Sequence, residues 1–238
     1  MQNQLTREQI VAFDHDEFVD DQVRHFSSLV HPIVSFNATV VDVGGGRGYF
    51  ASGVTAATGR QVIVIDTDAE SVRACVARGV RAHVGDALQP NVEARSAVVC
   101  FNLVLHHLVA DTERETRRLQ TAALRAWRSR SACVFVNEYI YESFFGHLSG
   151  KLIYLITQSA ILSALARIGS RWVPALKANT LGVGVRFRSD KEWRRLFSDA
   201  GYRVAASEKG RDEPISKVWR LLLIKRIARD SYCLSHDD

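Results

Sequence analysis

A short apolar strand that runs into four glycines constrains this chain more than any other feature. Residues 40–48 read V-V-D-V-G-G-G-R-G, so an apolar run carrying Asp42 leads into Gly44, Gly45, Gly46 and Gly48. The apolar run is typical of a strand buried in a parallel sheet. The glycines allow the backbone to turn sharply and to approach a ligand where a Cβ would collide. A helix is expected from about Gly48, with its positive end facing that ligand, so this stretch predicts the first unit of a nucleotide-binding α/β domain.

The spacing of the glycines narrows the choice of nucleotide. The dinucleotide fingerprint G-x-G-x-x-G, counted from Gly44, requires a third glycine where Tyr49 stands, so that fingerprint fails. The pattern that fits is Asp42 followed by G-x-G-x-G. It resembles the first motif of the class I S-adenosylmethionine-dependent methyltransferases. At this point a glycine-rich turn formed for steric reasons alone is the alternative.

The next strands carry polar residues at their ends in the order that this family shows. Residues 62–65 form an apolar run that ends at Asp66, about 20 residues past the glycines, where a carboxylate typically accepts hydrogen bonds from a ribose diol. A third strand, 80–84, ends in G-D-A, and a fourth, 97–101, leads into N-L-V-L-H-H. The last run resembles the family's post-strand motif, often written V-L-H-H. The resemblance covers residues 40–138 and extends less specifically to the C-terminus.

The resemblance implies a fold, a cofactor and a set of binding residues. The fold is α/β and Rossmann-like, with a seven-stranded, mostly parallel sheet in the order 3-2-1-4-5-7-6, helices on both faces and a helical cap. The cofactor is S-adenosyl-L-methionine, and in this family the G-D-A segment lines the adenine. The residues expected to bind the cofactor are Asp42, Gly44, Gly45, Gly46, Gly48, Asp66, Thr67, Asp86, Ala87, Asn102 and Leu103.

His106 is the candidate general base. It lies four residues after Asn102, like the histidine in the L-H-D-W run of O-methyltransferases, which takes a hydroxyl proton, and a neutral imidazole suits that role near pH 7. The sequence departs from that run, because His107 and Leu108 stand where Asp and Trp are expected. The alternative is that both histidines only cap or pack at the start of a helix.

The fifth strand supplies the other candidate residues of the site. Strand alternation places Asn137, Tyr139 and Tyr141 on one face and Glu138 on the other. Aromatic rings can stabilise a sulfonium or hold an aromatic acceptor, although ordinary strand packing explains them equally. Tyr139 and Asn137 join His106 as catalytic candidates, and His107 and Tyr141 are assigned to the substrate pocket. No metal site is expected. Arg186 and Arg188 could bind an acceptor anion, but exposed surface positions are the preferred interpretation.

The chain divides into four parts of a single domain. They are an N-terminal helical cap (1–37), the cofactor-binding core (38–142), a helical insertion that shapes the acceptor pocket (143–188) and a C-terminal part with the last helix and strands (189–238). Residues 152–166 of the insertion are apolar on nearly all sides, which predicts a buried helix over the active site or against a partner subunit. This run is shorter than the roughly 20 residues that span a bilayer.

Two capping boxes and two strands complete the expected layout. Thr6 with Gln9 begins an N-terminal helix, and Ser189 with Glu192 begins a helix that ends at Gly201. The last strands are expected at 202–207 and 218–224, and the resemblance implies that the seventh strand is antiparallel and lies between the fifth and the sixth.

Composition excludes several other classes of protein. The 238 residues carry a net charge of +5, and the arginines between positions 114 and 130 are interpreted as the solvated face of one helix rather than a nucleic-acid patch. The four cysteines form no C-x-x-C pair, which argues against zinc and redox motifs. No cleavable apolar segment begins the chain, so a cytoplasmic location is the default expectation.

Methyl transfer from S-adenosylmethionine to a small-molecule acceptor, in specialised metabolism, is therefore the leading hypothesis. One alternative keeps the cofactor and changes the reaction to an intramolecular cyclisation that releases methylthioadenosine, as in enzymes that resemble azetidine-2-carboxylate synthase. Another is a non-catalytic cofactor-binding subunit. The expected partners are a small-molecule acceptor or nothing beyond the cofactor, with no nucleic acid and no membrane span, and the apolar insertion is compatible with a homodimer.

Overall fold

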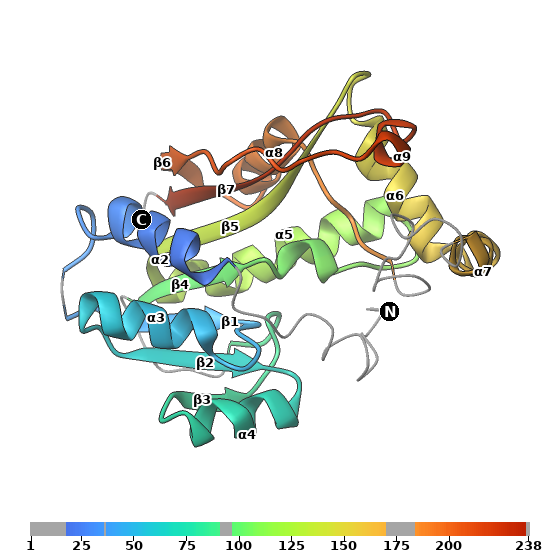
Figure 1. Ribbon diagram of the computed structural model, residues 1–238. Coiled ribbons are helices and arrows are strands. Elements are labelled where there is room, and N and C mark those ends of the chain that lie inside the picture. The colour runs from blue at the N-terminus through green and yellow to red at the C-terminus, as the bar shows by residue number, and fades with distance from the viewer. Residues whose placement is uncertain (1–17, 36, 91–96, 170–183, 237–238) are drawn as a thin grey trace.

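The computed structural model describes residues 18–35, 37–90, 97–169 and 184–236. Among these residues, seven strands form one sheet in the order β3-β2-β1-β4-β5-β7-β6 (Figure 1). The strands are β1 (Val40–Val43), β2 (Val62–Asp66), β3 (Arg81–Val84), β4 (Ala97–Asn102), β5 (Ser131–Ser143), β6 (Arg203–Glu208) and β7 (Ile224–Ser235). The strand order predicted from the sequence is confirmed.

The described residues also form eight helices, which alternate with the strands in the first half of the chain. They are α2 (Val19–Val30), α3 (Tyr49–Thr58), α4 (Ala69–Ala77), α5 (Glu113–Trp127), α6 (Leu148–Gln158), α7 (Ala160–Gly169), α8 (Asp190–Asp199) and α9 (Lys217–Arg220), with short 3-10 turns η1 (Leu105–His107) and η2 (Arg128–Arg130). None of the described helices is both long enough and apolar enough to cross a membrane.

Strand direction decides where the ends of the strands meet. β3, β2, β1, β4 and β5 pair in parallel, whereas β7 is antiparallel to both β5 and β6. Because parallel strands end at the same edge, the glycine loop after β1, Asp66 at the end of β2 and Asn102 at the end of β4 come together there. This edge is where ligands bind in open α/β sheets.

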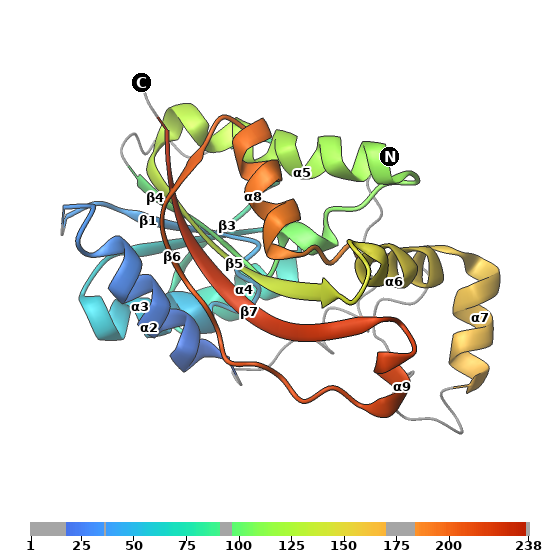
Figure 2. The same cartoon turned by 90° about the horizontal axis from the view of Figure 1, so that it is seen from above.

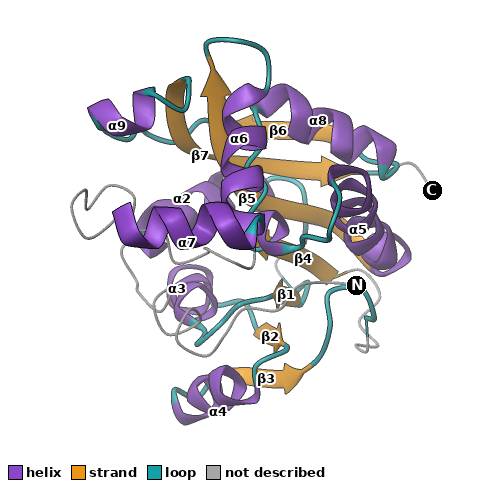
Figure 3. Ribbon diagram, turned by 90° about the vertical axis from the view of Figure 1, so that its right-hand side faces the viewer, coloured by secondary structure: helices purple, strands orange, loops and turns teal. Residues whose placement is uncertain are grey.

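Two layers of helices bury the sheet from opposite sides (Figure 3). On one face Phe26 of α2 and Phe50 of α3 meet edge to face, with ring centroids 5.9 Å apart. On the other face Trp127 of α5 and Trp193 of α8 are fully buried. All four residues of β1 are buried as well. Apolar strands between two helical layers are what the continuous V-V and V-I-V-I runs predicted.

The insertion differs from its prediction. Its described residues form two helices, not one, because Ser159 adopts an extended conformation (ψ 122°) that ends α6, and its hydroxyl then accepts the Leu162 N–H at 3.3 Å. The prediction that this apolar stretch is buried throughout is also wrong, since Leu155 and Ile161 are 55% and 74% exposed. Only one side of α6 packs, where the Tyr154 hydroxyl donates to the Ala110 carbonyl at 2.6 Å.

The last strand also differs from its prediction. Residues 218–224 were expected to form it, but 217–220 form α9 and the strand runs from Ile224 to Ser235. β7 pairs with β5 along almost its whole length, so polar residues such as Asp230 and Ser231 are buried within the sheet. Figure 2 shows β5 and β7 running out together beyond the other strands toward α6 and α9.

The capping boxes have different outcomes. The Ser189–Glu192 box is confirmed at the start of α8, with both reciprocal hydrogen bonds present. Thr6 and Gln9 lie outside the described residues. Of the N-terminal part, α2 packs against α3 and the β5–β7 region of the sheet.

Candidate active site

The glycine loop, residues 44–48, joins β1 to α3 at the ligand edge of the sheet. Gly46 and Gly48 have φ values of 52° and 78°, in the left-handed region that favours glycine. Among the described residues, a Cβ built on Gly46 meets no atom within 4 Å, whereas one on Gly45 would overlap the Asp42 carboxylate. Gly45 is therefore needed for the loop to pack on β1. Gly46 faces open space, as a loop that contacts a ligand requires.

Asp42 lies beneath this loop and is fully buried. Neither of its carboxylate oxygens has a hydrogen-bond partner among the described residues. Burial, with a smaller contribution from Asp66, raises the pKa of Asp42 to about 7. A buried carboxylate without a partner costs free energy unless it is neutral or meets a donor. The position therefore suits a ligand that brings a donor or a positive charge.

Asp66 holds the loop from the neighbouring strand. Its Oδ2 accepts the Gly46 N–H at 2.9 Å and its Oδ1 accepts the Asp68 N–H at 2.8 Å. Burial raises its pKa although these backbone hydrogen bonds oppose the rise. Each carboxylate oxygen keeps a second lone pair for a ligand hydroxyl. Thr67 follows in the exposed turn, and the Cys75 thiol contributes a further contact by donating to the Gly46 carbonyl at 3.1 Å.

The G-D-A segment lies at the same edge. Gly85 N–H donates to the Asp66 carbonyl at 3.0 Å, which brings the residues after β3 beside the end of β2. The Asp86 carboxylate accepts the Leu88 N–H at 2.9 Å, and the Ala87 carbonyl accepts Trp127 Nε1–H at 2.8 Å. The segment is thus fixed by its own turn and by α5.

Asn102 and Leu103 continue the site at the end of β4. Leu103 has a φ of 56°, an uncommon conformation for a residue with a side chain, and its N–H donates to the Asn137 carbonyl at 2.8 Å. The buried Oδ1 of Asn102 has no hydrogen-bond partner among the described residues. The turn brings Val104 over Gly44, where a Cβ would overlap its side chain. A strained backbone at Leu103 next to an unpaired acceptor on Asn102 is typical of a functional site.

His106 pairs with a buried carboxylate that sequence reasoning did not select. His106 Nδ1 lies 2.6 Å from Glu138 Oε2, and Glu138 Oε1 accepts the Leu105 N–H at 2.7 Å. His106 is 3% exposed and Glu138 is fully buried. With Nδ1–H donating to the carboxylate, Nε2 is the nitrogen that can accept a proton. An orienting acid behind a histidine is the arrangement of a general base.

Aromatic rings surround this pair. The His106 ring centroid lies 5.7 Å from that of Tyr139 and 5.0 Å from that of Phe187, and Tyr141 stacks on Phe187 at 4.3 Å. Burial and the adjacent His106 hold the pKa of His107 well below its usual range, so His107 is neutral. Burial, followed by Tyr139, raises the pKa of the Tyr141 phenol. The structure therefore brings His106, His107, Tyr139 and Tyr141 into one largely apolar cluster.

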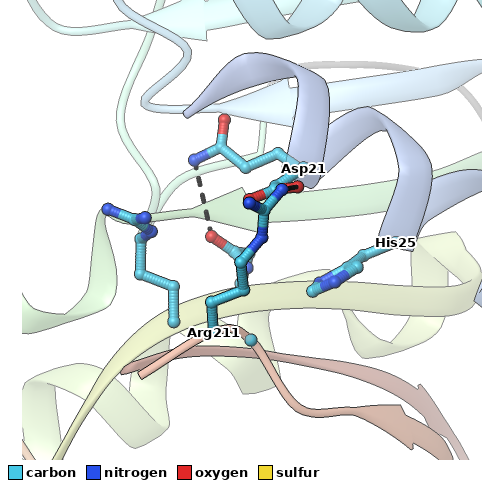
Figure 4. Close-up of a pocket in the computed structure, with 7 residues that line it drawn as sticks. Asp21, His25 and Arg211 are labelled. Atoms are coloured by element: carbon cyan, nitrogen blue, oxygen red, sulfur yellow. Dashed lines mark hydrogen bonds and ion pairs between the residues drawn. The ribbon is translucent and has the colours of Figure 1, made fainter. Parts of the chain in front are cut away.

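Asn137 lies apart from the cluster around His106. It is on the other face of β5 from Glu138, where its Nδ2–H₂ donates to Ser231 Oγ at 2.7 Å and its Oδ1 accepts from Gln22 Nε2 at 3.4 Å. It borders a pocket of about 10 Å³, roughly the space of one water (Figure 4). The pocket is lined by Asp21, Gln22, His25, Asn137, Gly210, Arg211 and Arg229.

The exposed positions expected for Arg186 and Arg188 are wrong. They were expected at exposed surface positions, but their side chains are 0% and 1% exposed. The Glu113 carboxylate accepts from Arg186 Nε at 2.7 Å and from Arg188 Nη1 at 2.9 Å. Their guanidinium groups form ion pairs inside the protein, between α5, α8 and the end of the insertion.

Glu138 is the main residue that sequence reasoning missed. Strand alternation did place it on the opposite face from Tyr139, but gave it no role. An available signal was an acid inside V-F-V-N-E-Y-I, a run otherwise expected to be buried, since buried acids are rare unless paired. Its partner His106 lies 32 positions earlier, and only the parallel pairing of β4 with β5 brings the two together.

Comparison with known proteins agrees with the observed fold. Residues 41–130 match the model of a family described as a methyltransferase domain. No curated protein matches the chain in sequence. Among solved structures, an S-adenosylmethionine-dependent methyltransferase from Leishmania major is similar with a TM-score of 0.62 and 11% identity, over 95% of this chain and 75% of that one.

Two further solved structures are similar over most of this chain. The 1,6-didemethyltoxoflavin-N1-methyltransferase from Burkholderia thailandensis, with 1,6-didemethyltoxoflavin and S-adenosylhomocysteine bound, has a TM-score of 0.58 and 16% identity, over 95% and 81% of the two chains. A pericyclic reaction enzyme has a TM-score of 0.56 and 13% identity, over 92% of this chain but only 47% of its own length. At these identities the likeness concerns the fold. The family match over residues 41–130 and the strand order support a relationship to the class I S-adenosylmethionine-dependent methyltransferase superfamily.

Proposed function

We propose that this chain transfers the methyl group of S-adenosylmethionine to a small-molecule acceptor that loses a proton to His106. The observation that carries the proposal is the buried His106–Glu138 pair, with 2.6 Å between Nδ1 and Oε2, at the sheet edge that also holds the glycine loop. A role in specialised metabolism is part of the proposal, and the likeness to the toxoflavin methyltransferase supports it.

The residues at the strand ends fit this cofactor. Bound there, it supplies an electrophilic methyl carbon on a sulfonium. The unpaired acceptors of Asp42 and Asn102 suit its positively charged and hydrogen-bond-donating groups, and the open side of Gly46 lets its atoms approach the backbone. In the same assignment Asp66 accepts from the ribose hydroxyls, and the segment 85–87 lines the adenine.

His106 takes the acceptor's proton on Nε2. Glu138 accepts the hydrogen bond from Nδ1, which selects the tautomer with its lone pair on Nε2 and stabilises the imidazolium that forms. The aromatic cluster of Tyr139, Tyr141 and Phe187 keeps water from the reacting groups and favours a planar acceptor. The insertion contributes to the wall of this acceptor pocket.

The test compares His106→Ala with the wild type on methyl-labelled cofactor and a panel of hydroxylated aromatic acceptors. Turnover to S-adenosylhomocysteine is expected to fall by about 10²–10⁴-fold, the usual contribution of positioned proton transfer. S-adenosylhomocysteine affinity, measured by calorimetry, is expected to stay within about twofold, because the imidazole serves the acceptor. Normal turnover in a folded mutant refutes the role of His106.

The same assay decides between this reaction and the alternatives. The likeness to a pericyclic reaction enzyme indicates that similar folds serve more than methyl transfer, so cyclisation of the cofactor is the second candidate. Methylthioadenosine formed without any acceptor identifies cyclisation. Tight binding of S-adenosylhomocysteine with no product from any acceptor identifies a non-catalytic subunit.

A further inference from the structure

We propose that Gln120, Arg186 and Arg188 are positioning residues for His106, and that the charges around them are coupled to the proton that His106 takes up. This inference rests on the proposed function, in which His106 is the base. It gives the end of the insertion a role in proton transfer in addition to its place in the pocket wall.

The backbone of residues 105–106 is held by a closed ring of hydrogen bonds. Gln120 Nε2 donates to the Leu105 carbonyl at 2.9 Å, and Gln120 Oε1 accepts from Arg188 Nε at 2.9 Å. The ring continues through Glu113, which binds both arginines, and closes where the Arg186 N–H donates to the His106 carbonyl at 3.0 Å. The base is therefore fixed at its ring by Glu138 and at its backbone by α5 and the end of the insertion.

Apart from the partly exposed Glu113, the side chains of this ring are buried, which holds them in one arrangement. Gln120 and Arg186 are 0% exposed and Arg188 is 1% exposed. Arg186 Nη2 also donates to Glu192 Oε1 at 2.6 Å, which ties the ring to the capping box of α8. Removing one partner from such a network leaves the other buried and unpaired, at a cost of several kcal/mol. A shift of the turn would break several of these bonds at once.

The cluster contains both acidic and basic groups. Glu113, Glu138 and Glu192 supply the acids and Arg186 and Arg188 the guanidinium groups, and His147 Nδ1 lies 3.4 Å from Glu192 Oε2. Burial works to raise the pKa of Glu113, but Arg188 and Arg186 outweigh it and hold that pKa below its ordinary value. Burial and Arg186 lower the pKa of Arg188 to about 10, so it stays charged at neutral pH.

His106 lies at the Glu138 end of this cluster. The groups that face His106 directly are Glu138 and Tyr139 from β5, His107 from η1 and Phe187 from the end of the insertion. Of these, His107 is neutral because its pKa is depressed, so Glu138 is the only one of the four with a charge. Arg229, whose guanidinium carbon lies 5.7 Å from the centre of the Tyr139 ring, is one further charge near the base, and the arginine cluster is another that acts through a region of low dielectric constant.

The experiment follows the ring nitrogens of His106 by NMR in the full-length, cofactor-free protein, so it requires no acceptor. Arg188→Gln makes the cluster more negative and is expected to move the pH at which His106 takes up a proton upward by about half a pH unit or more. Glu113→Gln is expected to move it downward, by less, because the Glu113 side chain is 39% exposed and screened by solvent. Arg81→Gln on the exposed strand β3 carries the same charge change and serves as the control.

Arg188→Lys tests the positioning role of Arg188 separately from the effect of its charge. It keeps the positive charge but cannot reproduce both the Gln120 and the Glu113 bonds, so the titration is expected to stay near that of the wild type while turnover falls about tenfold or more. Equal titrations for Arg188→Gln and Arg81→Gln overturn the charge coupling, and unchanged turnover in Arg188→Lys overturns the positioning. If Arg188→Gln does not fold, Glu113→Gln alone still tests the coupling. Failure of the proposed function is distinguishable, because it shows as full turnover in His106→Ala.

Discussion

Asp42 is predicted to make the stability of this protein depend on pH in an unusual direction. Its carboxyl group is fully buried without a hydrogen-bond partner among the described residues, and burial raises its pKa from 3.8 to about 7. The folded state therefore holds a proton that the unfolded chain releases. This stabilisation is fully present below the unfolded pKa and is lost as the pH rises through about 7.

The magnitude follows from the difference between the two pKa values. Each factor of ten in proton affinity is worth about 1.4 kcal/mol, so the change from 3.8 to about 7 corresponds to about 4 kcal/mol over the full range. Between pH 5 and pH 8 the wild type is expected to lose about 2 to 3 kcal/mol of this contribution. Asp42→Asn removes the titration while preserving the shape, so the variant becomes more stable relative to the wild type as the pH rises.

Urea unfolding of both proteins at pH 5, 6, 7 and 8, followed by circular dichroism, measures this difference directly. Groups that titrate equally in both proteins cancel from it. Asp86→Asn is the matched control, since the carboxyl group of Asp86 is half-buried and hydrogen-bonded to the Leu88 N–H. A difference between Asp42→Asn and the wild type that stays constant within about 0.5 kcal/mol from pH 5 to pH 8 would refute the assignment of a neutral, buried Asp42.

Three further changes test the cofactor site and the fold. Gly46→Val places a branched side chain where the loop is open, so calorimetry is expected to detect no S-adenosylhomocysteine binding while the circular dichroism spectrum is retained. Asp66→Asn weakens hydrogen bonds to a ribose diol, and the same calorimetry is expected to give an affinity at least about tenfold lower, since a charged hydrogen bond is worth about 1.5–3 kcal/mol. Ser189→Ala removes the cap of α8 and is expected to lower the free energy of unfolding by about 1 kcal/mol, without a change in S-adenosylhomocysteine affinity.

The first half of the fold could be predicted because its signals are local. The strand, the glycine turn and the start of a helix occupy about ten consecutive residues, and Asp66 stands at the end of an uninterrupted apolar run. Parallel strands buried on both faces produce such runs, and their ends meet at one edge whatever the rest of the chain does. The strand order of the second half came from the family resemblance, not from the residues.

In the second half of the chain, the structure differs from what the local sequence patterns predict, and the reasons are physical. β7 lies between two strands of the sheet yet carries Arg226, Arg229 and Asp230, because ion pairs with the segment before α9 and within the strand satisfy these charges. The apolar run before it, 218–224, was more strand-like in composition. Likewise, the burial of Arg186 and Arg188 depends on Glu113, more than 70 positions away. Sequence spacing carries no signal for pairs at that distance.

The free-energy cost of burying the His106–Glu138 pair helps to decide among the three candidate functions. A fully buried carboxylate lowers stability unless its partners compensate for desolvation. A subunit that only binds the cofactor gains little from such a pair beyond the Glu138 bond to the Leu105 N–H, because neither residue is among those expected to bind the cofactor. Both reactions can use it: an acceptor hydroxyl must lose a proton to attack the methyl carbon, and the cofactor's own amine must be deprotonated before it can cyclise. The pair therefore favours catalysis over binding alone, and the identity of the released nucleoside decides between the two reactions.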